Sequence, residues 1–236
     1  MTRNQIHRIL LSAFALAAAL GAAKLALAQD AKQQYASMAP LDQYLMDHDA
    51  EIALARSAAP ESVSRDADVL VLGRHGFETA VKGKNGFVCL VERGWTAAPD
   101  PDFFNPKVRV PMCDNAAAAR SYLLRTLKMT DLVLAGRTKA QVEEAIFAAV
   151  DKQELPVMEL GAMCYMMSKQ GYGGDNAPHW PSHVMFFFSN FDPASWGANL
   201  PGSPVMAVSD FSEHPSEHLT EFAVGVQRWS DGTEAH

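Results

Sequence analysis

The chain has 236 residues, of which 48% are hydrophobic, and its formal net charge is −7 at pH 7. This hydrophobic content excludes global disorder, and the length is sufficient for one domain with a full core. An acidic chain without basic clusters also lacks a positively charged surface for nucleic acids or anionic membranes, so neither is an expected partner.

The first 28 residues have the order of charged and apolar residues that is typical of a secretory signal peptide. Two arginines precede an apolar run over 9–23, and an Ala-Leu-Ala cleavage site follows at 26–28. The alternative is an uncleaved anchor, but Lys24 ends the apolar run, which is shorter than the about 20 residues that cross a bilayer. We therefore expect a signal peptide over 1–28 and a single domain over 29–236. We also expect no stable membrane anchor after signal cleavage and a periplasmic or secreted location.

Three cysteines, Cys89, Cys113 and Cys164, allow one disulfide in an exported protein and leave one thiol over. Cys89 and Cys113 are nearest in sequence, and Cys113 falls in an expected loop, so this is the pair that we expect. Buried free thiols are the alternative, because cysteine packs well as a small hydrophobic residue.

The expected elements of the first half begin with a helix over 40–57, whose apolar residues share one face, and a strand over 69–74. Strands over 78–82 and 87–92 follow. Asn85-Gly86 between them supplies the positive φ angles of a type I′ turn, so we expect a hairpin. Four prolines between residues 94 and 115 predict an irregular excursion.

The second half begins with an expected helix over 116–129 and a second helix that starts at Thr138. Thr138 and Gln141 fit a capping box, and apolar residues at helical spacing follow as far as Pro156. Residues 205–208 predict a strand. The segment after 219 fits either a helix or a strand, and its β-branched residues and Gly225 favour the strand. This order of elements predicts an α+β domain with a mainly antiparallel sheet packed by two to three helices.

The most informative stretch runs from Glu159 to Phe191. Short apolar runs over 160–167 and 184–188 predict buried core strands. The glycine-rich segment between them, Lys169 to His183, is long for a connection inside a compact domain. We therefore interpret it as the functional loop.

The first candidate function of this loop is metal binding. His179 and His183 can ligate through neutral imidazole nitrogens, Asp175 and Glu159 could add ligands, and a divalent transition metal such as zinc suits this set. In an extended segment the two histidines would lie about 13 Å apart, at about 3.3 Å per residue, so the flanking prolines must fold the loop back. The alternative is an ordinary loop whose histidines bond to the backbone.

The second candidate is a pocket for a small apolar ligand, walled by aromatic residues. The aromatic residues that surround the loop in sequence are Tyr165, Tyr172, Trp180, Phe187 and Trp196. The alternative is an ordinary aromatic core. The expected function is therefore binding of a small molecule or metal ion by an exported protein.

A metal-dependent hydrolase that uses His179 and His183 is the alternative function. A less favoured set, His214, Glu217 and His218, matches the H-x-x-E-H pattern of inverted zincin metalloproteases. Pro215 restricts a helix there, and only 18 residues remain for a further acidic ligand.

Overall fold

The computed structural model describes residues 35–97, 101–175, 177–208 and 219–235. The chain divides into two units, Met1–Ala36 and Ser37–His236, and every element below belongs to the second unit. The expected signal peptide over 1–28 lies outside the described residues, and so do His214, Glu217 and His218. No helix in the described part of the chain is long and apolar enough to cross a bilayer.

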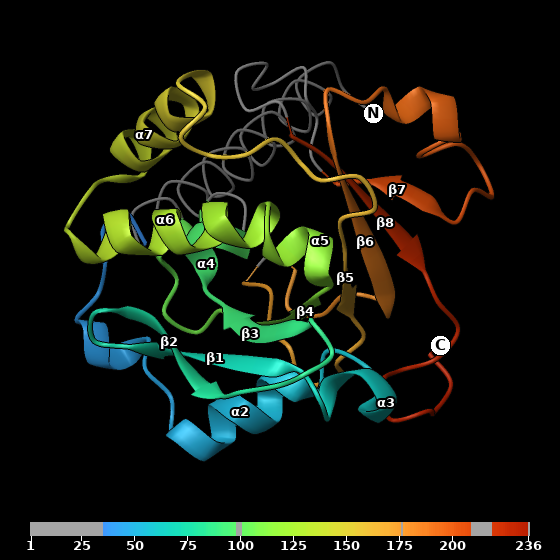
Figure 1. Ribbon diagram of the computed structural model, residues 1–236, viewed down its shortest axis with the longest axis horizontal. Helices are drawn as coiled ribbons and strands as arrows, with labels where there is room; N and C mark the ends of the chain where they lie inside the picture. The colour runs from blue at the N-terminus through green and yellow to red at the C-terminus, as the bar shows by residue number, and fades with distance from the viewer. Residues whose placement is uncertain (1–34, 98–100, 176, 209–218, 236) are drawn as a thin grey trace, which may run out of the picture. The chain divides into compact units, whose positions relative to one another are not determined.

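The second unit is a single α+β domain built on one eight-stranded sheet (Figure 1). The strands are β1 Asp68–Gly73, β2 Gly76–Val81, β3 Val88–Glu92, β4 Val110–Asp114, β5 Met163–Met166, β6 His183–Ser189, β7 Val205–Ala207 and β8 Leu219–Gly225. Their order is β2-β1-β3-β4-β5-β6-β8-β7, and only β1 and β3 pair in parallel. The expected α+β class with a mainly antiparallel sheet is confirmed.

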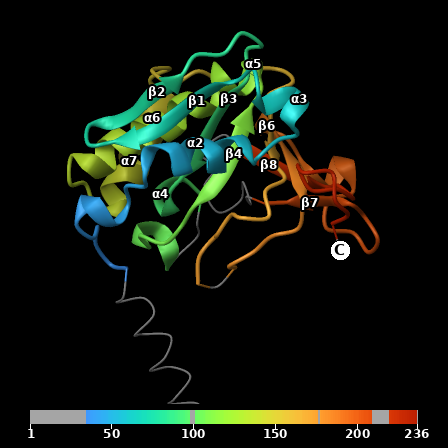
Figure 2. The same ribbon diagram turned by 90° about the horizontal axis from the view of Figure 1, so that it is seen from below.

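Helices cover both faces of the first part of this sheet. The α-helices of the described residues are α2 His48–Arg56, α3 Glu61–Ser64, α4 Gly94–Ala97, α5 Ala116–Ala119, α6 Tyr122–Leu134 and α7 Lys139–Asp151, and the 3-10 turns are η1 Leu41–Gln43, η2 Asp102–Phe104 and η3 Pro193–Trp196. Helix α2 lies on one side of β1, β3 and β4, and α5 and α6 lie on the other side (Figures 1 and 2).

The sequence features of α7 produce the helix that they predict. Thr138 and Gln141 form the reciprocal capping box, and Val142, Ile146 and Ala149 are buried along one face. The expected helix over 116–129 is instead two helices, α5 and α6, and α6 continues to Leu134. The last segment is strand β8, as its β-branched residues indicated.

The expected hairpin across Asn85-Gly86 is wrong. Strand β1 lies between β2 and β3, so the true hairpin joins β1 to β2 and ends at the Gly73–Gly76 pair. A local turn does exist, because Gly86 has a φ of +79° and the Asn85 side chain accepts a hydrogen bond from the Phe87 N–H at 3.0 Å. The turn residues determine only the local backbone conformation, and β2 and β3 both pair with β1 instead of with each other.

Strand β4 was missed because Pro111 and its neighbouring prolines indicated a loop. The backbone N–H and C=O of Arg109 both hydrogen-bond to the backbone of Tyr172, at 2.8 Å. Backbone groups two residues apart on a strand point to the same side, so those of Pro111 and Cys113 also point to the side on which β5 lies. The pairing of β4 with β5 begins only at Cys113. Pro111 therefore sits in a gap of the ladder, where its missing N–H leaves no partner unsatisfied.

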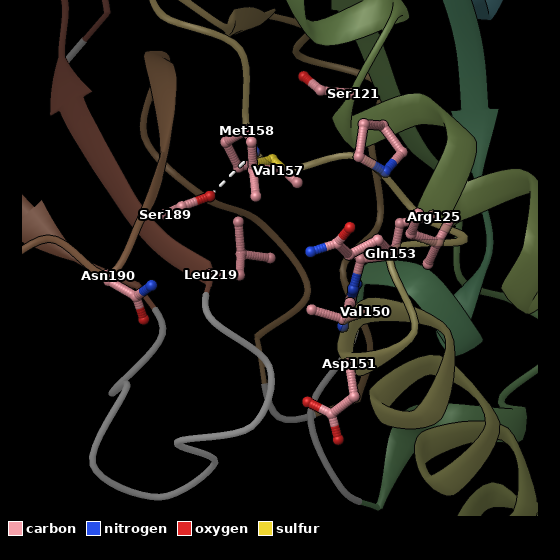
Figure 3. A pocket seen from close by; sticks show the side chains of 12 residues that line it. Ser121, Arg125, Val150, Asp151, Gln153, Val157, Met158, Ser189, Asn190 and Leu219 are labelled. Atoms are coloured by element: carbon pink, nitrogen blue, oxygen red, sulfur yellow. Dashed lines mark hydrogen bonds between the residues drawn. The ribbon is translucent and has the colours of Figure 1, made fainter.

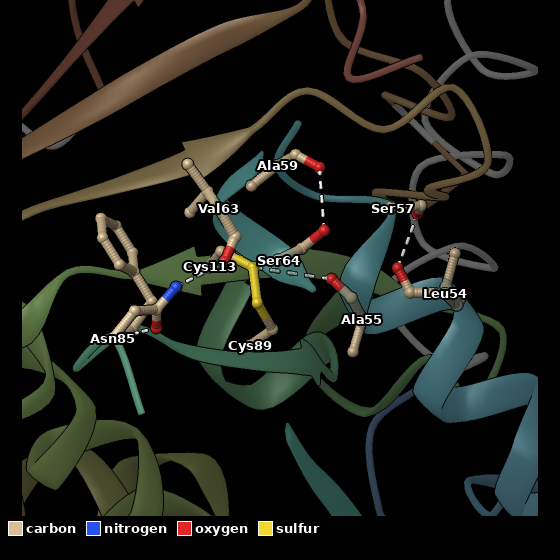
Figure 4. Close-up of a disulfide and its surroundings, with 10 residues drawn as sticks. Leu54, Ala55, Ser57, Ala59, Val63, Ser64, Asn85, Cys89 and Cys113 are labelled. Atoms are coloured by element: carbon tan, nitrogen blue, oxygen red, sulfur yellow. Dashed lines mark hydrogen bonds between the residues drawn. A yellow bond between two sulfur atoms is a disulfide. The ribbon is translucent and has the colours of Figure 1, made fainter. Parts of the chain in front are cut away.

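A disulfide joins Cys89 to Cys113, as expected (Figure 4). The two residues lie directly opposite each other on β3 and β4, and α2 covers them through residues such as Ala55. Cys164 is a free, buried thiol. The bond therefore ties together two neighbouring central strands.

A buried ion pair holds α2 to the sheet. The Arg93 guanidinium lies 2.9 Å from a carboxylate oxygen of Glu51, and both side chains are almost completely buried. The same Glu51 oxygen accepts the Leu72 N–H at 3.1 Å, and Arg93 Nε donates to the Tyr44 carbonyl at 3.0 Å. These bonds compensate for the loss of water around the two charges.

Candidate ligand-binding site

A cavity of about 400 Å³ lies on the α6 side of the sheet, and we call it the sheet cavity. Its floor consists of side chains of β4, β5, β6 and β8, and its sides come from α4, α6 and the segment before β6. Most of the lining is apolar, and it includes Val110, Met112, Met166, Met185, Met206 and Ala223.

Glu92, the last residue of β3, brings a carboxyl group into this apolar cavity. Leu90 and Glu92 face the α6 side because side chains alternate along a strand, whereas the next residue, Arg93, joins the ion pair under α2. The Glu92 side chain is 1% exposed, and the Thr126 hydroxyl donates to its Oε1 at 2.8 Å. Burial raises the pKa of Glu92 to about 7, so its carboxyl is partly protonated at neutral pH.

His183, the first residue of β6, supplies a neutral imidazole. Its Nδ1 lies 2.7 Å from the Pro181 carbonyl oxygen, which can only accept, so Nδ1 carries the proton. Burial lowers the pKa of His183 below its ordinary value, although this hydrogen bond opposes the shift. The unprotonated Nε2 is therefore a lone-pair acceptor at neutral pH.

Glu221 of β8 and Tyr122 of α6 also line the sheet cavity. Glu92 and Glu221 come from strands that are separated by three others, yet the Glu221 charge contributes to the raised pKa of Glu92. The strand direction turns strongly between β3 and β8 (Figure 1), and both acids line the same cavity. Burial and both carboxylates raise the pKa of Tyr122 well above its ordinary value, so its phenol stays protonated.

The glycine-rich loop positions Trp180 as one wall of the sheet cavity. A Cβ on Gly171 would lie 2.3 Å from the indole Cη2, and one on Gly173 would lie 3.2 Å from Cζ3. Only residues without a side chain let the backbone pass this close to the ring. Asp102, which is buried, fixes the same loop by accepting the Asp175 N–H at 3.2 Å.

Of the five aromatic residues expected around a ligand, only Trp180 is among the described residues that line the sheet cavity, and Phe187 lies beneath the lining residue Tyr122. Tyr165 points to the α2 side of the sheet, where its ring packs 6.1 Å from that of Phe87, because it alternates with Cys164 and Met166 on β5. Tyr172 donates its hydroxyl hydrogen bond to Asp175. Trp196 stacks on Phe222 with the ring centroids 5.0 Å apart.

The structure also separates the four expected metal ligands. His183 lines the sheet cavity, whereas His179 is exposed and lines a different cavity, with Trp180 and Pro181 shared between the two. Glu159 is held by Arg120 at 2.6 Å, and Asp175 lies 3.6 Å from Lys107. Within the described ranges, no group of three or more His, Cys, Asp or Glu side chains could hold a metal ion.

Figure 3 shows a second cavity, of about 320 Å³, between the end of α7 and the ends of β6 and β8. The Ser189 hydroxyl accepts the Met158 N–H at 2.9 Å across one side of it. Three of its polar residues, Asp151, Gln153 and Asn190, are exposed. Water already solvates these groups, so a hydrogen bond from a ligand to one of them contributes less binding free energy than a hydrogen bond to the buried carboxyl of Glu92.

Glu92 and Glu221 were missed as site residues. A sequence signal for Glu92 exists, because it continues the apolar strand that contains Leu90 on the same face. The Glu221 signal is similar, since Glu221 lies on the same face of β8 as the buried Leu219 and Ala223. An acid at an inward position of a strand is unusual enough to mark a candidate site.

Comparison of the chain with known protein families, with curated proteins and with solved structures finds no match. The functional argument therefore rests on the geometry of the sheet cavity.

Proposed function

We propose that the domain binds a small, largely apolar molecule in the sheet cavity. The observation that carries this proposal is an apolar cavity of about 400 Å³ with a single completely buried carboxyl, that of Glu92, in its wall. Cavities that bind small molecules commonly have this size, an apolar lining and a few polar groups that orient the ligand.

Contacts within the protein also hold two aromatic side chains of the cavity wall in place. Trp180 is held by close contact with two glycine backbones, and its Nε1 donates to the Met166 carbonyl at 3.4 Å. Tyr122 stacks on Phe187 with the ring centroids 3.9 Å apart. A site with fixed walls loses little conformational entropy on binding, which favours affinity. We keep the prediction of a periplasmic or secreted location, and a disulfide is typical of such proteins.

A fluorescent apolar probe, N-phenyl-1-naphthylamine, tests this proposal on the mature protein. We expect it to bind with enhanced emission, because the cavity excludes water from the probe. Ala177→Phe places a ring at an exposed lining position and should weaken binding by about tenfold or more, since it occupies the space of the ligand. Ala140→Phe, at an exposed position of α7, is the matched control and should leave the affinity unchanged.

Two results would overturn the proposal. One is a wild-type protein that does not enhance the emission of the probe. The other is equal binding by the wild type and Ala177→Phe, because the probe would then occupy another surface.

A further inference from the structure

Three polar side chains of the sheet cavity carry hydrogen-bond acceptors. Glu92 and Glu221 present carboxyl oxygens, and His183 presents the lone pair of Nε2, because its Nδ1 proton is used on the Pro181 carbonyl. The hydroxyl of Thr96 donates to the Arg93 carbonyl at 3.1 Å. A ligand with N–H or O–H donors can therefore bond to these acceptors.

The wall is also biased in charge. No Lys or Arg is among the described residues that line the sheet cavity, which include two acids. Arg125 of α6 acts on Glu92 electrostatically, but it belongs to the lining of the second cavity. This field offsets the burial of Glu92 only in part, because the pKa of Glu92 stays raised, so a ligand that carries a positive charge would stabilise its carboxylate further.

The remaining surface suits the body of an organic cation. The thioethers of Met112, Met166 and Met185 form much of the floor, and the rings of Tyr122 and Trp180 stand beside them. Methionine adapts its shape to irregular apolar groups, and aromatic faces attract cations. The same walls would hold an inorganic cation poorly, because they give it too few oxygen ligands.

We propose that the ligand of the sheet cavity is a small hydrophobic amine in its protonated, ammonium form. This inference rests on the proposed function, because it names the ligand class of the same cavity. In the bound state the ammonium N–H groups donate to the carboxylate of Glu92, and the apolar body lies against the methionine floor.

Binding of such a cation should depend on pH, since Glu92 must be ionised to attract it. The groups that act on Glu92 are Glu221 from β8, Arg125 and Thr126 from α6, and Thr96 from α4. With a Glu92 pKa of about 7 in the ligand-free protein, the cation should lower this pKa and release a proton. The affinity for an amine should therefore increase between about pH 6 and about pH 8, while an amine of lysine-like pKa, about 10, stays protonated.

Three compounds with one common body provide the test: 4-tert-butylbenzylamine, 4-tert-butylbenzyl alcohol and 4-tert-butylbenzoate. Isothermal titration calorimetry at about pH 8 should show that the amine binds about tenfold or more tightly than the alcohol, with the benzoate weakest. Glu92→Gln should remove this preference and leave the affinity for the alcohol within about threefold, because the amide keeps the volume and the acceptor for Thr126. Glu61→Gln, an exposed acid of α3, should change nothing.

The outcomes separate this inference from the proposed function. Equal affinities for the amine and the alcohol, or a Glu92→Gln variant that weakens both equally, would overturn the inference and leave the ligand cavity in place. Failure of the amine to bind to a protein that binds N-phenyl-1-naphthylamine would also overturn it. Failure of every compound and of the probe would refute the proposed function itself.

Discussion

Replacement of Glu92 by glutamine tests whether burial in the sheet cavity raises the pKa of this carboxyl. The pKa of this carboxyl is about 7 in the folded protein and 4.5 in an unperturbed chain, so the folded state binds the proton more tightly. A group of this kind stabilises the fold while it is protonated, and the stabilisation is lost as the pH rises from 4.5 to 7. At about 1.4 kcal/mol per pH unit, the loss is about 3 kcal/mol.

Glu92→Gln abolishes this titration while it keeps the hydrogen bond from Thr126. The difference in unfolding free energy between variant and wild type should therefore move in favour of the variant by about 2 to 3 kcal/mol between about pH 5 and about pH 8. Urea denaturation at several pH values measures it. Burial and the Glu92 charge raise the pKa of Asp114 well above its ordinary value, so loss of that charge in the variant lowers the Asp114 pKa and moves the difference in the same direction. A difference that stays constant over this range would refute the reasoning.

Three further substitutions test the parts of the fold that support the cavity. Cys113→Ser should lower the free energy of unfolding by about 3 kcal/mol, since the disulfide spans 24 residues, and reduction of the wild type should give a similar loss; unchanged urea midpoints would contradict this. Glu51→Gln should destabilise by about 3–5 kcal/mol, because it leaves a buried guanidinium uncompensated, and a loss below about 1 kcal/mol would mean that the charge is relieved in another way. Gly171→Ala should displace the indole of Trp180, cost about 1–3 kcal/mol and weaken the binding of the naphthylamine probe. Gly225→Ala, where a Cβ meets nothing within 4 Å, is its control, and equal behaviour of the two variants would argue against the proposed packing of Trp180.

The sequence predicted those elements whose signals are local. The capping box at Thr138 and the β-branched residues of β8 act within a few residues, and the structure has the helix and the strand that they indicate. Asn85-Gly86 also makes a turn, but its strands pair with β1 and not with each other. Strand pairing is set by long-range packing, which a turn does not encode.

The candidate site was predicted only in part for the same reason. Trp180 and His183 lie in the functional loop or at its end, so the loop indicated them directly. Glu92 and Glu221 stand on strands that are far apart in sequence, and only the folded sheet brings both of them to the lining of one cavity. The aromatic residues Tyr165 and Trp196 are close to the loop in sequence, but strand alternation and ring stacking place them on other surfaces.

The most direct test of the central claim uses methionine methyl groups as reporters of the bound probe. In protein labelled with methyl-¹³C methionine, addition of N-phenyl-1-naphthylamine should shift the methyl resonances of Met112, Met166 and Met185, which line the sheet cavity. The resonance of Met158, which lines the second cavity, and that of Met129, buried in α6, should stay in place. Shifts at Met158 without shifts at the three floor residues would contradict the account, because the ligand would then occupy the other cavity.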